Sequence, residues 1–197
     1  VDHSVPTVLL YGKNSDTVYH LGGNQILYGD KLTISADSHL DGIVLIARTI
    51  AIEDGFHGCG QFFCTDSLLI GTGVHLSAPS GLFVSGHEHP YIAIGKNSKV
   101  EGYVIVLNGG KEDKELRYPS LAQQRGSQIS GLVYIDGAAM LAGVVNGSAF
   151  LGDCFTQVNG RRCPGVLRDV QFSYDADAVY PKLLKGPYRR REIRKVH

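Results

Sequence analysis

A histidine-rich pentapeptide contains the residue types in this chain that are best suited to hold a metal ion. Gly86-His87-Glu88-His89-Pro90 places two imidazoles and a carboxylate within three residues, and zinc and nickel take these ligands. Further ligands must come from elsewhere, and His57, near the first two cysteines, is the other suggestive position. A loop of solvated histidines explains the segment as well. We therefore assign no metal and no cofactor, and keep His87, Glu88 and His89 as candidate ligands.

The four cysteines are candidates for two disulfides. Cys154 and Cys163 flank a turn-prone segment, residues 159–162. A bridge between them would pin a region with little core of its own and contribute roughly 2–3 kcal/mol. Cys59 and Cys64 form the second candidate pair. The alternative is four reduced thiols that pack as small apolar side chains. An oxidising compartment is compatible with this cysteine content.

The C-terminal end of the chain is basic. Residues 182–197 hold seven Lys or Arg and one Glu, so they carry +6, while residues 1–181 carry −6. The candidate anion- or partner-binding residues are Arg189, Arg190, Arg191, Arg194 and Lys195. Such a cluster can bind anionic lipid or a polyanionic glycan, but no RNA-binding motif accompanies it, so no nucleic-acid partner is expected. The alternative is a solvated extension that pairs with the acidic body of its own or a neighbouring copy.

No motif for a catalytic nucleophile or a phosphate-binding loop is present. The sequence has no Gly-x-Ser-x-Gly elbow, no P-loop and no dinucleotide fingerprint. Residues 94–99 invite comparison with left-handed β-helix acyltransferases and γ-class carbonic anhydrases, which gives an enzyme alternative. Those families hold a strict register over many turns, and here no trio of histidines is spaced to meet, although His57 and His75 can stack. We therefore predict that the chain is not an enzyme.

The composition favours many short strands joined by tight turns. Of 197 residues, 25 are glycine, tryptophan is absent and Met140 is the single methionine; the usual glycine level is about 7%. No run approaches the roughly 18 apolar residues of a membrane-spanning helix. The chain begins Val1-Asp2-His3, so we expect contact with a membrane only through a segment that is missing from this chain.

A short pattern recurs along the sequence. It consists of two apolar residues one apart, a turn, another apolar residue and then a glycine, most clearly in residues 92–102. The closing glycines fall at residues 42, 58, 81, 102, 131 and 147. Most are followed by further apolar residues, at 43–46, 82–84, 103–107 and 132–135. This spacing is typical of a coil of roughly 16–18 residues that takes insertions at its corners.

The repeat predicts an all-β fold. Alternation turns every second side chain inward, and coils stacked about 4.8 Å apart close an apolar core. We expect a single-stranded β-helix (β-solenoid) of about 6–8 coils, with corner insertions and a capped C-terminal end; a sandwich or barrel is the alternative. The expected divisions are an N-terminal strand or cap (1–25), coils (26–150), a C-terminal cap (151–181) and a basic tail (182–197). Residues 175–180 are a candidate short helical turn.

The repeat resembles that of the bactofilins, polymer-forming bacterial β-helix proteins. The later part resembles a group of uncharacterised bacterial β-helix proteins, often from Bacteroidetes, with a membrane-anchored, pilin-like N-terminus. The resemblance covers about residues 40–180, and the segments that carry it are residues 50–56, 94–98, 131–137 and 143–148. It implies a structural role in the cell envelope.

These observations lead to a non-enzymatic structural or assembly (scaffold) protein of the bacterial cell envelope. We expect an extracytoplasmic location, with a cytoplasmic, membrane-associated one as the alternative. The expected partners are further copies of the chain or other envelope proteins. A second function class is a glycan- or partner-binding module that uses corner loops 77–90 and 108–128.

Overall fold

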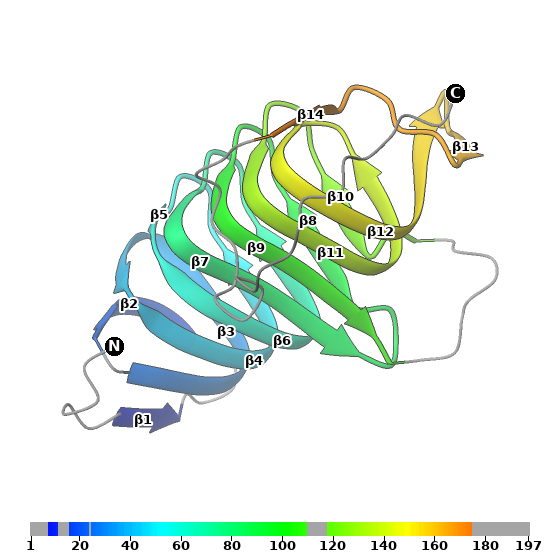
Figure 1. The fold of residues 1–197 in the computed structure, drawn as a ribbon. Helices are drawn as coiled ribbons and strands as arrows, with labels where there is room; N and C mark the ends of the chain where they lie inside the picture. Colours follow the sequence, from blue (N-terminus) through cyan, green and yellow to red (C-terminus); the bar gives the residue numbers. More distant parts are fainter. Residues whose placement is uncertain (1–7, 12–15, 24, 110–117, 175–197) are drawn as a thin grey trace, which may run out of the picture.

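The computed structural model describes residues 8–11, 16–23, 25–109 and 118–174 (Figure 1). The regular elements of these residues are all strands, so the predicted all-β class is confirmed. The strands are β1 (Val8–Tyr11), β2 (Asp16–Gly22), β3 (Gln25–Asp41), β4 (Ile43–Ile52), β5 (His57–Gly58), β6 (Gly60–Ile70), β7 (His75–Gly86), β8 (Tyr91–Ile94), β9 (Lys99–Asn108), β10 (Leu121–Gln123), β11 (Gln128–Leu141), β12 (Val144–Val158), β13 (Arg161–Pro164) and β14 (Gln171–Ser173).

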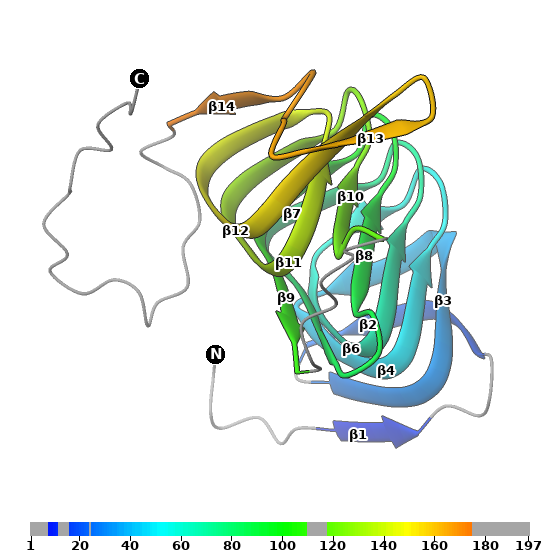
Figure 2. The same ribbon diagram turned by 90° about the vertical axis from the view of Figure 1, so that its right-hand side faces the viewer.

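The prediction of a single-stranded β-helix, or β-solenoid, is wrong. Six parallel strands pair in the order β6, β8, β10, β11, β9 and β7, and β7 pairs back with β6, so they close into a parallel β-barrel. The other strands lie outside this ring. β4 and then β3 follow from β6, and both β1 and β2 pair with β3. β12 follows from β11 and pairs with β13 and β14, and β5 pairs with β7. In Figure 2, β8 and β10 lie on one side of the ring and β7 and β9 on the other.

The ring closes because two long strands bend and pair with different neighbours along their two halves. In β6, residues 61–64 pair with β7 and residues 67–70 pair with β8. In β11, residues 128–135 pair with β9 and residues 139–141 pair with β10. The repeat in the sequence indicates which side chains point inward. It does not show that the pairing from β6 through β8 and β10, and the pairing from β6 through β7 and β9, both lead to β11.

Aliphatic side chains fill the interior and lie in register from strand to strand. Leu32, Ile50, Leu68, Ile92 and Leu121 are successive partners on β3, β4, β6, β8 and β10, and each is fully buried. Burial of one such side chain contributes about 1.5–3 kcal/mol. The register is firmly specified, because a slip of one residue would turn a whole inward column toward solvent.

Two closing glycines of the repeat allow neighbouring strands to approach closely at a corner. Gly102 has a φ of 151°, and a Cβ at this position would lie 1.8 Å from the carbonyl oxygen of Ser80. Gly147 has a φ of 141°, and its Cβ would lie 2.1 Å from the carbonyl oxygen of Gly131. Any other residue would force the strands apart, so these glycines are required by sterics.

The described chain ends in a hairpin and a short strand that extend from β12. β13 is antiparallel to β12, and β14 pairs in parallel with residues 144–146. β12 runs without a break across the division expected between residues 150 and 151. The candidate helical turn at residues 175–180, the basic tail and part of corner loop 108–128 lie outside the described residues.

Candidate functional site

An outward-pointing column of apolar side chains runs across seven neighbouring strands. β3, β4, β6, β7, β9, β11 and β12 each contribute one residue, and each residue is the register partner of the next. We call this set the aromatic column; its members are Tyr28, Ile46, Phe63, Phe83, Ile105, Tyr134 and Phe150. Five of the seven are Phe or Tyr, and all five rings are exposed or partly exposed, so the column is mainly aromatic.

A second outward column lies beside the first, two residues earlier on each strand. Its members are Ile26, Val44, Gln61, Gly81, Tyr103, Leu132 and Ser148. Neither column contains a charged residue. We call the two columns together the aromatic face, which is an uncharged strip of sheet seven strands wide.

Two neighbouring rings of the aromatic column are stacked. The Phe63 and Phe83 rings lie 4.6 Å apart between centroids, with planes 3° from parallel. The ring of Tyr103, from the second column, lies 5.1 Å from that of Phe83 and is tilted by 56°. The most exposed side chains of the column are Phe150 at 58%, Tyr134 at 44% and Phe63 at 37%, while Phe83 and Ile105 are only partly exposed. Phe63 and Phe83 each have one ring face covered by the other ring.

A hydrogen-bonded bridge fixes the second column. The Tyr103 hydroxyl donates to Oε1 of Gln61 at 3.0 Å, and Nε2 of Gln61 donates to the carbonyl oxygen of Pro79 at 2.7 Å. This bridge passes over Gly81, where a Cβ would lie 2.3 Å from Gln61 Oε1 and 2.4 Å from the Tyr103 ring. The aromatic face is therefore held in shape by side-chain hydrogen bonds as well as by the sheet.

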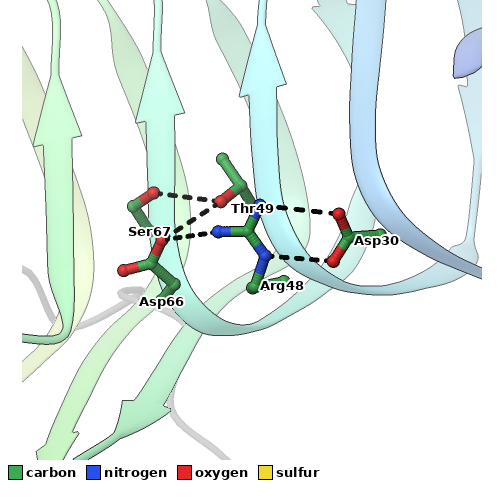
Figure 3. Close-up of polar contacts among 5 residues, drawn as sticks. All are labelled: Asp30, Arg48, Thr49, Asp66 and Ser67. Carbon is green, nitrogen blue, oxygen red and sulfur yellow. Dashed lines mark hydrogen bonds and ion pairs between the residues drawn. The ribbon is translucent and has the colours of Figure 1, made fainter. Parts of the chain in front are cut away.

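A short row of charges borders the aromatic face, two or three residues after the aromatic column on each strand. Arg48 on β4 lies between Asp30 on β3 and Asp66 on β6, with its Nε 3.0 Å from Asp30 Oδ1 and a terminal nitrogen 3.2 Å from Asp66 Oδ2 (Figure 3). The hydrogen bond and the charge of Asp30 raise the pKa of Arg48. All three side chains are about half exposed, so solvent screens both ion pairs strongly. The row forms a polar rim of two carboxylates and one guanidinium, with a formal charge of −1.

The candidate metal ligands point to two different places. His87 and Glu88 line an open groove beside Arg48, and Nδ1 of His87 lies 2.9 Å from the carbonyl oxygen of Gly109. His89 lies instead in a cavity of about 290 Å³ and makes an edge contact with Tyr118, at 6.3 Å between ring centroids. The described residues contain no group of three His, Cys, Asp or Glu side chains that could hold a metal ion.

The predicted disulfides are wrong, because all four cysteines are free thiols. In the β12–β13 hairpin, Cys163 pairs with Thr156, whereas the backbone of Cys154 accepts a bond from Gly165, so the two thiols are two residues out of register. Cys64 points into the core, and burial raises its pKa to about 12.

The other cysteine of the first pair lies at a corner. The Cys59 thiol is 3.5 Å from Asp41 Oδ1 and accepts a hydrogen bond from the backbone of Gly42 at 3.3 Å. Cys59 is partly exposed, whereas Cys64 is buried in the core. The two cysteines are close in the sequence, but their spacing does not show that one side chain is partly exposed and the other buried.

Histidines and charges gather on a different side of the molecule. His57 and His75 are register partners with rings 5.8 Å apart, and the next partner of His75 is Lys99, not a third histidine. Glu101 forms an ion pair with Lys99, and its Oε1 lies 3.6 Å from Nε2 of His75. The hydrogen bond from Lys99 is the main reason that the pKa of Glu101 is lowered. This row is a surface ladder of paired polar groups.

Sequence reasoning did not identify the aromatic face, although the sequence holds a signal for it. Residues 43–46 and 103–107 are continuous apolar runs, where a strand with one wet face would alternate apolar and polar residues. Continuous runs are typical of parallel strands that are covered on both faces. The anion-binding candidates Arg189, Arg190, Arg191, Arg194 and Lys195 lie outside the described residues.

Comparisons of the chain with protein-family models, with curated proteins and with solved structures find no match. The resemblance to the bactofilins consequently rests on the repeat alone. The part of the chain that the structure describes contains no helix with the length and apolar character needed to cross a membrane.

Proposed function

We propose that this chain is a non-enzymatic structural or assembly protein that docks onto a protein surface through the aromatic face. The single observation that carries the proposal is the register of the aromatic column across seven strands. Apolar side chains scattered singly over a surface are ordinary, but a contiguous apolar strip marks a contact site.

The composition of the aromatic face supports its docking onto another protein in aqueous solution. The strip has an apolar centre, and the Arg48 row gives it a charged rim, as in many protein–protein contacts. The ring stack and the Tyr103–Gln61 bridge hold the side chains in place before docking. A preordered surface loses less side-chain entropy when a partner binds.

Ring orientation favours a protein over a sugar chain at this face. Carbohydrates pack on the exposed faces of aromatic rings, whereas one face of each of the Phe63 and Phe83 rings is covered by the other. Ring edges pack well against aliphatic side chains and against the faces of other aromatic rings. A partner protein supplies both kinds of group.

Ligand binding through the corner loops is the second candidate function. The observation that favours it is the cavity of about 290 Å³ between the loop before β8 and the segment before β10, lined in part by His89, Tyr91 and Tyr118. A glycan array probed with the full chain and with Tyr91→Ala tests this role. Binding that Tyr91→Ala abolishes would favour it, and a blank array would dismiss it for glycans.

The envelope location remains a prediction from the resemblance, and fractionation of cells that make the full protein tests it. The docking role is tested in the same cells with a photo-crosslinking amino acid placed at Tyr134. We expect a light-dependent adduct of higher mass from position 134 and none from Leu69, which is similarly exposed (40%) on another side of the molecule. Absence of an adduct from position 134 would contradict the docking role.

A further inference from the structure

We infer that the occupant of the aromatic face is a second copy of this chain, packed face to face about a two-fold axis. The inference rests on the proposed function and names its partner. In such a dimer each copy offers the same strip, so the strip must be compatible with itself.

Charge is the first reason to choose a second copy. A self-paired face fails when like charges meet across it, and the two columns contain no charged residue. The formal charge of the whole chain is also zero, so two copies do not repel one another at long range. Charged residues border the strip on both sides. Asp30, Arg48 and Asp66 pair with one another within each copy, and Glu101, two residues before Tyr103, pairs with Lys99. Asp136, two residues after Tyr134, adds one exposed carboxylate to the rim.

Shape is the second reason. The face is a regular parallel sheet, and two sheets pack with their strands nearly aligned at a spacing of about 10 Å. Overlap of the two strips is greatest when the axis passes through the middle row, which contains Phe83. The ring edges of one copy then meet the rings and aliphatic side chains of the other.

Area sets the expected strength. Seven strands at about 4.8 Å spacing and five residues at about 3.3 Å rise give a strip of about 29 by 16 Å. Each copy therefore offers on the order of 450 Å² in plan, so the pair buries on the order of 900 Å² or somewhat more. This lies just below the roughly 1,000 Å² expected of a specific interface, as in a weak, transient contact. The dimer should accordingly be weak, with a Kd in the micromolar range.

Sedimentation velocity of the full chain, from about 1 µM to about 300 µM, tests the inference. We expect a concentration-dependent monomer–dimer equilibrium. The double variant Tyr134→Ser/Phe150→Ser should raise the Kd at least about tenfold. Both side chains are exposed, so folding should be preserved, and circular dichroism checks this. The control Leu69→Ser, which removes a side chain that is 40% exposed on another side of the molecule, should change the Kd less than about twofold.

Salt separates this dimer from pairing through the basic tail. An apolar contact should persist at about 1 M NaCl, whereas pairing of residues 182–197 with an acidic body should be lost. A monomer at every concentration, a dimer lost in salt, or equal weakening by Leu69→Ser would overturn the inference. A dimer that forms only after deletion of residues 175–197 would also overturn it, because that segment would then be the occupant in the full chain.

The mass of the crosslinked adduct in cells distinguishes the inference from the proposed function. An adduct of twice the chain mass supports both. An adduct of any other mass overturns the second copy as occupant and leaves the docking role intact. With no adduct at all, the docking role itself fails.

Discussion

Tyr103 on β9 and Gln61 on β6 are joined by a 3.0 Å hydrogen bond although β7 lies between their strands. The bond is possible because the intervening residue is Gly81, whose missing side chain leaves room for both groups. Three strands of the aromatic face are thereby tied together from the outside. Gly81, one of the closing glycines of the repeat, thus makes room for a side-chain hydrogen bond between neighbouring strands, a role that the repeat pattern did not indicate.

Replacing Gly81 should destabilise the fold. A Cβ there meets Gln61 and Tyr103 at 2.3 and 2.4 Å, so Gly81→Ala must displace the bridge, and we expect a loss of about 1–3 kcal/mol in the free energy of unfolding. Urea denaturation measures the change. Gly22→Ala is the matched control, because the nearest atom to a Cβ there is 3.9 Å away. Equal stability of the Gly81 and Gly22 variants would show that the bridge contributes nothing.

Neighbouring leucines on β6 should respond very differently to truncation. Leu68 is fully buried, whereas Leu69 is 40% exposed. Leu68→Ala should cost about 2–5 kcal/mol, because it leaves a cavity in the core. Leu69→Ala should stay within about 0.5 kcal/mol of the parent chain. The same denaturation experiment compares them, and similar losses for both would contradict the inward direction of the Leu68 column.

Thiol reactivity should separate Cys64 from the other three cysteines. All four are free, but Cys64 alone is buried and its pKa is raised to about 12. A thiol-reactive chromophore at neutral pH should therefore label three cysteines in the folded chain and the fourth only after unfolding, since the thiolate is the reacting species. Cys64→Ser should leave the folded-state count unchanged. Fewer than four thiols after unfolding without reductant would reveal a disulfide.

Acid should remove the contribution of Glu101 to stability. Lys99 lowers the pKa of Glu101 in the folded chain from its ordinary 4.5. The carboxylate therefore stabilises the fold above about pH 4.5, and this contribution is lost as the pH falls through the lowered value. Glu101→Gln should lower the melting temperature at pH 7, and the difference from the parent should shrink below pH 4.5. A difference that stays constant with pH would refute the ion pair.

Periodicity along the sequence determined the all-β class, the inward columns and the position of close-approach glycines such as Gly102. These features depend on local geometry, because side chains alternate along any strand and only glycine fits where two backbones nearly touch. The continuous apolar runs at residues 43–46 and 103–107 also carried the information that both faces of these strands are apolar.

Tertiary structure alone decided how the strands close, where the thiols point and what lies on the outer face. Ring closure depends on β6 and β11, because each of them pairs with two different strands along its two halves. The alternation of inward and outward side chains along these strands does not reveal this change of partner. The separation of Cys154 from Cys163 depends on the register of the β12–β13 hairpin. The alignment of Tyr28 through Phe150 into one column depends on strand pairing across corner insertions of different lengths, and their spacing along the chain cannot reveal it.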